Sequence, residues 1–306
     1  MANSSLRAAK DAKNDEFYTR IEDINEELNY YEDKFRDKIV FCNCDDPKWS
    51  NFWKYLHMNF EYLGLKKLIT THYEADNVQT YKIEYMGGYD KDFNYGVVTA
   101  LTQNGDFRSP ECIELLKEAD IVVTNPPFSL AREYIACLMK YKKSFLIIGD
   151  MNWITYKEVF PLLKDNQIWL GNCAIKEFIQ PDGTTKKFGN KLWFTNLDHS
   201  KRHGFIETTY LYSKKDELYP DLYPKYDNYD AINVDKVSEI PMDYDGVMGV
   251  PITFLGKHNP EQFEIIGISG TLAKSFRDNN GKFCSGRFYV NGKRLYDRIA
   301  IRRKQS

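Results

Sequence analysis

Residues 120–128 read Asp-Ile-Val-Val-Thr-Asn-Pro-Pro-Phe. The four residues 121–124 form the short apolar and β-branched run that is typical of a strand buried on both faces of a sheet. Pro126 and Pro127 end the run, because proline has no N–H to donate to a neighbouring strand. Similar apolar runs lie elsewhere in the chain, at residues 38–44, 65–71 and 144–148. Strands of this kind, separated by helical segments, predict an α/β fold with a mostly parallel sheet and helices on both of its faces.

The segments around these runs carry helix signals. The apolar spacing in residues 21–35 predicts one helix, and Ser50 is placed to cap a second helix that runs to about Leu63. Pro110 opens a third helix, and residues 129–141 form a fourth. The second, third and fourth helices each lie between two predicted strands, which is the arrangement of the βαβ unit.

The later part of the chain shows hairpin signals instead. Residues 174–195 predict a hairpin that turns at Asp182-Gly183, and Asn291-Gly292 marks a further hairpin. We therefore predict two domains: an α/β core in residues 1–172, and a more β-rich part in residues 173–306 that also supplies the remaining strands of the core.

Charge is distributed unevenly along the 306 residues, although the formal net charge is only −2. Residues 282–306 hold eight Lys and Arg against one Asp, whereas residues 216–245 hold nine acids against two Lys. The first segment is suited to contact phosphate groups, and the second would repel them. A solvated basic tail is the alternative interpretation of the first segment.

Several classes of protein do not fit the sequence. No run approaches the roughly 18 apolar residues of a membrane helix, and the polar first 16 residues do not resemble a secretory signal. Six scattered cysteines are typical of reduced thiols, so we expect a cytoplasmic protein without membrane contact. The histidines lack metal-ligand spacing, so no metal is expected. The chain has neither a P-loop motif for nucleotide hydrolysis nor a Pro-Cys pair for methylation of cytosine C5.

The Asn-Pro-Pro-Phe segment at 125–128 follows the carboxyl end of a strand, where open α/β sheets bind their ligands. Its prolines hold backbone carbonyls in fixed directions, Asn125 adds an amide oxygen, and Phe128 adds a flat face. Two acceptors beside a ring suit the exocyclic amine of adenine, whose lone pair becomes available when both N–H groups are accepted. S-adenosylmethionine is the matching methyl donor, and the carbonyl dipoles would offset the charge that develops on the base. An ordinary turn at a strand end is the alternative interpretation.

Five segments extend the pattern along nearly the whole chain: Asn14–Thr19, Cys42–Pro47, Asn125–Phe128, Trp193–His199 and Asn291–Arg294. In this order and spacing they resemble the EcoRI-type family of adenine-specific DNA methyltransferases. The resemblance implies a Rossmann-like core that uses S-adenosylmethionine, and methyl transfer to N6 of an adenine flipped out of double-stranded DNA. It implies a bacterial or phage-encoded enzyme whose residues 173–306 recognise DNA. We expect a monomer that does not require a cognate restriction endonuclease, although such a partner can exist.

The resemblance also assigns residues to the site. Asn125 and Pro126 match the acceptors of the amine hydrogens, Pro127 follows them, and Phe128 matches the ring that stacks on the flipped base. The predicted cofactor residues are Phe17, Tyr18, Thr19, Asn43, Asp45, Asp46, Glu74, Asp106, Phe107 and Asn125. The predicted DNA-phosphate contacts are Lys186, Lys187, Lys191, Arg202, Lys293 and Arg294.

Three assignments in the cofactor region stay open. The glycine-rich loop that usually follows the first strand is replaced by Cys-Asp-Asp-Pro, in which either Asp45 or Asp46 can approach the cofactor. The acid on the cofactor ribose is Glu74 or Asp76, and we prefer Glu74. Asp106 is either a contact to the adenine of the cofactor or part of a turn that initiates a helix.

Two alternative functions are compatible with the same residues. An Asn-Pro-Pro-Phe site also suits methylation of cytosine N4, of adenine in RNA or of glutamine in a protein. Because the usual glycine loop is missing, a catalytically silent DNA-binding module is the second alternative.

Overall fold

The computed structural model describes residues 18–74, 79–88, 96–180, 183–278 and 280–304. Two compact units make up the chain. The first unit comprises Met1–Trp153 and Leu170–Asp198, and the second comprises Ile154–Trp169 and His199–Ser306. The domain boundary that the sequence predicts at residue 172 lies inside a strand of the first unit.

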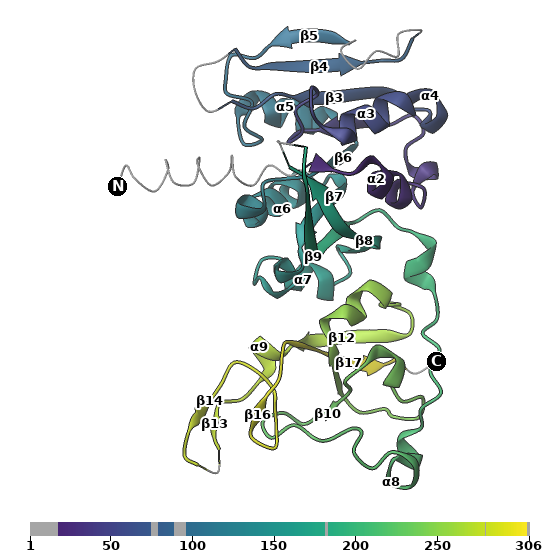
Figure 1. The fold of residues 1–306 in the computed structure, drawn as a ribbon, viewed down its shortest axis with the longest axis vertical. Helices are drawn as coiled ribbons and strands as arrows, with labels where there is room; N and C mark the ends of the chain where they lie inside the picture. Colours follow the sequence, from purple (N-terminus) through teal and green to yellow (C-terminus); the bar gives the residue numbers. More distant parts are fainter. Residues whose placement is uncertain (1–17, 75–78, 89–95, 181–182, 279, 305–306) are drawn as a thin grey trace. The chain divides into compact units, whose positions relative to one another are not determined.

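A nine-stranded sheet with the order β1-β8-β9-β7-β6-β2-β3-β4-β5 forms the centre of the first unit (Figure 1). Its four middle strands are parallel: β7 (Ser144–Asp150), β6 (Ile121–Thr124), β2 (Ile39–Cys42) and β3 (Lys67–Thr71). The outer strands are β1 (Tyr18–Thr19), β8 (Trp169–Ile179), β9 (Thr185–Thr195), β4 (Tyr81–Tyr85) and β5 (Val97–Ala100).

The sheet is mixed, whereas the sequence predicts a mostly parallel one. Strand β9 pairs antiparallel with β7, β4 with β3, and β5 with β4. Each side of the parallel group is thus extended by strands that do not return through a helical crossover, which a parallel neighbour would require. The fold class is therefore α/β with a large mixed sheet.

Helices appear where the sequence predicts them, but they are shorter. The first unit contains α2 (Ile21–Leu28), α3 (Asn51–Met58), α4 (Phe60–Leu63), α5 (Pro110–Glu118) and α6 (Ala131–Lys140). The helix predicted for residues 21–35 ends at Leu28 and is followed by a separate 3-10 turn. Asn59, with φ −99° and ψ 13°, interrupts the helix predicted to reach Leu63. No helix within the described residues is both long and apolar enough to cross a bilayer.

Both faces of the parallel strands are buried. Val40 and Cys42 of β2 pack in one cluster with core residues of α2, α3 and α4. Phe41 points to the opposite face, because side chains alternate along a strand, and it is equally buried. Helices α5 and α6 pack on β2 and β7. The carboxyl ends of the parallel strands meet at one edge of the sheet, where their connecting segments are grouped.

The second unit contains a four-stranded sheet with the order β10-β11-β17-β12. These strands are β10 (Ile232–Asn233), β11 (Met248–Pro251), β17 (Arg298–Arg303) and β12 (Phe263–Ile268). Its helices are α7 (Phe160–Lys164), α8 (Lys215–Leu218) and α9 (Ser269–Leu272), and its hairpins pair β13 (Phe276–Arg277) with β14 (Phe283–Cys284) and β15 (Tyr289–Val290) with β16 (Lys293–Arg294). The turn predicted at Asn291-Gly292 is confirmed, and both of its residues have positive φ.

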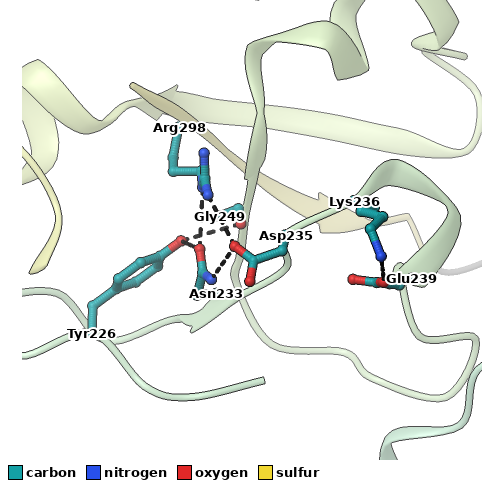
Figure 2. Close-up of polar contacts among 7 residues, drawn as sticks. All are labelled: Tyr226, Asn233, Asp235, Lys236, Glu239, Gly249 and Arg298. Carbon is teal, nitrogen blue, oxygen red and sulfur yellow. Dashed lines mark hydrogen bonds and ion pairs between the residues drawn. The ribbon is translucent and has the colours of Figure 1, made fainter. Parts of the chain in front are cut away.

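A polar network links the strands of this smaller sheet (Figure 2). The Arg298 guanidinium donates to Asn233 Oδ1 and to Asp235 Oδ1, each at 3.1 Å. The Tyr226 hydroxyl lies 2.9 Å from Asn233 Oδ1 and 3.1 Å from the carbonyl of Gly249. A Cβ atom at position 249 would lie 2.1 Å from that hydroxyl, so only glycine fits there. The network fixes β10, β11 and β17 against one another.

Candidate active site

Asp45 occupies the turn after β2, beside the carboxyl end of β6. Its carboxylate accepts hydrogen bonds from the Ser50 hydroxyl at 2.8 Å, from the Thr124 hydroxyl, and from the backbone N–H of Asn125 at 3.3 Å. Burial raises the pKa of Asp45 to about 6, although the hydrogen bonds from Thr124, Ser50 and Asn125 oppose the shift. Asp45 thus joins the turn after β2 to the first residue of the Asn-Pro-Pro-Phe segment.

Ser50 and Thr70 also hold the turn after β2 in place. Ser50 caps α3 and accepts hydrogen bonds from the N–H groups of Phe52 and Trp53 at 3.1 and 3.3 Å. Thr70, at the end of β3, places its hydroxyl 2.5 Å from the carbonyl of Asp45. The turn is therefore shaped by hydrogen bonds from the N-cap residue of α3 and from the ends of β3 and β6.

Asn43 is also predicted to contact the cofactor, and it is almost fully buried. The hydroxyl of Tyr134, on α6, donates to Asn43 Oδ1 at 2.5 Å. Burial raises the pKa of Tyr134 well above its usual value, so the hydroxyl keeps its proton for this bond. Phe107 is 4% exposed and packs edge-on against the Tyr134 ring, with 5.0 Å between ring centroids.

Asp46 is partly exposed and faces the segment after β3. Its Oδ2 lies 2.7 Å from His72 Nδ1, and its Oδ1 accepts the N–H of Lys48 at 2.9 Å. The His72 ring stacks on Tyr81 at 5.0 Å. Of the two aspartates in this turn, Asp45 is an internal anchor, whereas Asp46 lies nearer the solvent.

The segment that leads into α5 approaches the end of β3 closely. Gly105 has φ +74°, and a Cβ atom there would lie 2.3 Å from the carbonyl oxygen of His72. The N–H of Glu74 donates to the carbonyl of Asn104 at 3.1 Å. Glu74 and Asp106 are therefore brought to the same edge of the sheet, whereas Asp76 lies outside the described residues.

Asp106 binds Arg108 rather than remaining free at the helix start. The guanidinium donates to the two carboxylate oxygens at 2.9 and 2.7 Å. Burial acts to raise the pKa of Asp106, but Arg108 outweighs it and holds the pKa below its usual range. Asp106 thus stays ionised, and Arg108 N–H also donates to it at 2.8 Å, as expected for a turn that begins a helix.

The N-terminal strand lies beside the start of α3. Asn51 donates its side-chain amide to the carbonyl of Thr19 at 2.8 Å. The Thr19 hydroxyl is buried and has no hydrogen-bond partner among the described residues. Tyr18 pairs with Ile179 in β8 and is partly exposed, whereas Phe17 lies outside the described residues.

Phe128 lies beside an ion pair between the buried Lys191 and the partly exposed Asp150. The Lys191 ammonium is 3.8 Å from the centroid of the Phe128 ring and 2.8 Å from Asp150 Oδ2. Asp150 is the last residue of β7, and its Oδ2 also accepts the Asn190 amide at 2.7 Å. Phe178 approaches Phe128 edge-on at 6.5 Å. A cation and an acid therefore lie directly beside the ring that is predicted to stack on the target base.

Known proteins resemble this chain over nearly its whole length. A family model described as adenine-specific methyltransferase EcoRI matches residues 5–304. The chain belongs to this family. The Type II methyltransferase M.EcoRI of Escherichia coli is 48% identical to it, over 96% of this chain and 98% of the relative. M.MgeORF184P of Mycoplasma genitalium and M.MpnI of Mycoplasma pneumoniae, also Type II methyltransferases, are each 37% identical over 97% of this chain and 98% of the relative. No solved structure matches the chain significantly.

Membership of the EcoRI methyltransferase family makes the chain an adenine-specific DNA methyltransferase. The resemblance found in the five sequence segments is thereby confirmed. The family assignment does not by itself say which side chains act. Those roles rest on the geometry described above.

The predicted phosphate contacts fall into distinct environments. Lys186 and Lys187 are exposed on β9, and Lys293 and Arg294 are exposed on β16 of the second unit. Lys191 is only 6% exposed. The structure places its ammonium inside the candidate active site, so its charge is not presented to a phosphate on the surface.

Arg202 differs from the exposed cations. Its guanidinium lies 3.9 Å from the centroid of the Trp169 ring and 3.3 Å from Asn166 Oδ1. The Arg202 guanidinium therefore already makes contacts within the second unit.

Sequence reasoning missed Asp150, Thr124 and Tyr134. Asp150 follows the apolar run at 144–148, so the rule that selected Asn125 also applied to it. Tyr134 carries no comparable signal, because its place opposite Asn43 depends on how α6 packs.

Proposed function

We propose that the chain is a site-specific enzyme that transfers a methyl group from S-adenosylmethionine to N6 of an adenine flipped out of double-stranded DNA. The observation that carries the proposal is the Asn-Pro-Pro-Phe segment at the end of β6, whose first N–H is bonded to the buried Asp45. The four parallel strands form a Rossmann-like core with this segment at their carboxyl edge. We also propose a cytoplasmic monomer that needs no endonuclease for activity.

The residues present fit the proposed cofactor. The Thr19 hydroxyl is a buried donor with no partner among the described residues, and Asp46, Glu74 and Asp106 supply acceptors at the same edge of the sheet. Polar groups of this kind suit the amino, ribose and adenine groups of S-adenosylmethionine. When bound, this cofactor supplies a methyl group on a positively charged sulfur.

The chain's own residues prepare the adenine amine. Asn125 Oδ1 and the Pro126 carbonyl accept its two N–H groups, which favours a tetrahedral nitrogen with an available lone pair. Phe128 packs against the base and fixes the direction of that lone pair. Positive charge develops on the base during transfer, and the fixed carbonyl dipoles stabilise it.

The ion pair of Lys191 and Asp150 lies beside the Phe128 ring and holds it in place. An ammonium 3.8 Å from a ring centroid makes a favourable cation–π contact. Asp150 neutralises that ammonium, so the developing positive charge on the base is not opposed by an uncompensated cation. This arrangement supports a base-binding role for Phe128.

Two substitutions test the proposal. Asn125→Ala removes an amine acceptor and Phe128→Ala removes the stacking ring, so we expect each to abolish methyl transfer to DNA while cofactor binding persists. Transfer is measured with radiolabelled S-adenosylmethionine, and cofactor binding by equilibrium dialysis. Lys117→Ala, on the exposed face of α5, is the control. Wild-type turnover in either site variant would show that the assigned roles are wrong.

The identity of the product is tested separately. Methylation-sensitive sequencing of DNA from cells that express the protein should find N6-methyladenine at one short sequence. Mass spectrometry of nucleosides from treated DNA and RNA separates adenine N6 from cytosine N4 and from RNA products. A methyl group found only in RNA or in protein would overturn the DNA assignment.

A further inference from the structure

The second unit contains two short hairpins, β13–β14 and β15–β16. Aromatic side chains in and beside these hairpins are exposed to solvent. Figure 1 labels β13, β14 and β16 of this region. The Tyr296 side chain, just after β16, is 90% exposed, and Phe283 on β14 is 60% exposed. In β14, Phe283 points outward while its neighbour Cys284 is buried, as strand alternation requires. We call residues 274–296 the hairpin surface.

Cations surround these rings. The exposed cations of the hairpin surface are Lys274, Arg277, Lys282, Lys293 and Arg294. None of them has an ion-pair partner within the part of the chain that the structure describes. The one acid of the segment, Asp278, accepts the backbone N–H groups of Asn280 and Lys282 at 3.0 and 2.9 Å. The hairpin surface therefore carries five exposed cations without ion pairs, and the acids Asp278 and Asp227 beside them bind backbone N–H groups instead.

The bases of the two hairpins are fixed to each other by one buried side chain. The Asn228 amide donates to the carbonyls of Lys274 and Arg287, each at 2.9 Å, and its Oδ1 accepts the N–H of Tyr289 at 3.2 Å. Asp227 accepts the N–H of Gly292 at 2.8 Å, in the turn of the second hairpin. These bonds hold both hairpins in one arrangement.

A small cluster of apolar residues packs at the base of the two hairpins. Phe288 is fully buried, and its ring lies 4.4 Å from that of Tyr226 and 4.9 Å from that of Tyr229. Leu295, the neighbour of Tyr296, packs against this cluster. The exposed rings and cations are thus displayed on a packed base, which lowers the entropy cost of using them to bind a partner.

We propose that the hairpin surface binds duplex DNA, with Tyr296 and Phe283 in contact with bases and the five cations in contact with phosphates. Unpaired cations supply the salt-dependent part of DNA affinity. Exposed rings beside them supply the part that does not depend on salt, because an apolar side chain can contact base edges in a groove or insert at a base step. This inference rests on the proposed function and extends it to the residues that hold the DNA outside the candidate active site.

The two parts of the proposal are separated by measuring the affinity for DNA across salt concentrations. The probe is a 30-base-pair duplex that contains the sequence methylated by the wild-type enzyme. We expect Tyr296→Ala to weaken binding about 10-fold at every salt concentration, as for loss of one buried apolar contact. We expect Lys293→Ala to lower the slope of log affinity against log salt by about one.

Two further variants make the test specific. Tyr296→Phe keeps the ring, so we expect it to bind DNA like the wild type. Tyr62→Ala removes a tyrosine that is 65% exposed in the first unit, and we expect it to leave DNA affinity unchanged. Wild-type affinity in Tyr296→Ala, or an equal loss in Tyr296→Phe, would overturn the ring–base contact.

Failure of the proposed function has a different signature. In that case the wild-type protein would transfer no methyl group to DNA. A wild-type enzyme that methylates DNA, together with Tyr296→Ala and Lys293→Ala variants that bind it normally, would overturn the hairpin surface alone.

Discussion

Asp45 is an acid whose burial links the stability of the fold to pH. Its pKa of about 6 in the folded chain lies above the usual value of 3.8. A raised pKa means that the folded state favours the protonated acid, so the stabilisation is complete below about pH 4 and is lost as pH rises through about 6.

The matched variant is Asp45→Asn, which cannot ionise. We expect the free energy of unfolding of the wild type, relative to this variant, to fall by about 2–3 kcal/mol between pH 4 and pH 7. Urea unfolding of both proteins across this range provides the measurement. A difference that does not vary with pH would contradict the assignment of the titration to Asp45.

Lys191 gives a prediction about turnover. Lys191→Met keeps the length of the side chain but removes the ion pair with Asp150 and the cation beneath Phe128. We expect kcat for DNA methylation to fall about 10-fold, because the stacking ring loses its cation contact and the partly buried Asp150 carboxylate loses its ion-pair partner. Cofactor affinity should not change.

Lys186 supplies the contrast on the same strand. It is exposed, so Lys186→Met should raise KM for DNA and leave kcat unchanged. Steady-state kinetics on both variants distinguishes the two positions. Equal changes in KM with no change in kcat would place Lys191 among the phosphate contacts after all.

At this scale the sequence predicted the segment 125–128 but not the surroundings of its residues. The sequence itself shows the end of a strand, two prolines and an aromatic residue. It does not show whether a lysine is buried, and for that reason Lys191 was predicted to be a surface cation. A signal was present, since Lys191 shares one face of β9 with the core residue Trp193 two positions later.

Among the elements, α3 connects helix capping to the candidate active site. Ser50 both caps α3 and donates to Asp45. We expect Ser50→Ala to destabilise the fold by about 1–2 kcal/mol and to reduce methyl transfer, because the cap and a bond to the anchoring acid are lost together.

Ser109 is the matched control, because it caps α5 by accepting the N–H of Cys112 at 3.2 Å without touching Asp45. Ser109→Ala should cost similar stability and leave kcat unchanged. Thermal unfolding and turnover measured on both variants decide the matter. A loss of kcat in Ser109→Ala equal to that in Ser50→Ala would show that capping alone explains the effect.

Elements were easier to predict than their ends. Buried apolar runs located all four parallel strands, since a strand covered on both faces has few polar positions. Helix ends depend on packing. The residues before Asn59 contain no sequence signal for the helix end that the structure shows there. Strand β1 is too short, at two residues, for any periodic pattern.

For the whole molecule, the division into two units predicts separate responses to the cofactor. Every described residue that is predicted to bind S-adenosylmethionine belongs to the first unit. We expect S-adenosylmethionine at 100 times its dissociation constant to stabilise that unit by about 2.7 kcal/mol and to leave the second unit unchanged.

Differential scanning calorimetry with and without the cofactor measures this response. The transition assigned to the first unit should move to higher temperature. Phe128→Ala serves as a control, because it should keep the shift while losing turnover. An equal shift of the second unit's transition would contradict a cofactor site confined to the first.

The sequence predicted the fold class better than the division of the chain. The segment 154–169 joins the second unit because α7 packs against β12, about a hundred residues later. A contact between segments so far apart in the chain produces no signal in the local sequence. The mixed character of the sheet was missed for a related reason, since the apolar pattern of a strand does not state the direction of its neighbour.

The turn after β2 is held by hydrogen bonds from Ser50, Thr70 and Thr124. A turn held by the chain's own side chains has its shape before a small molecule binds beside it. Binding there costs little free energy for ordering the loop, so the affinity reflects the contacts themselves. Because these hydrogen bonds hold the turn rigid, molecules that differ in shape from the natural ligand should bind there more weakly.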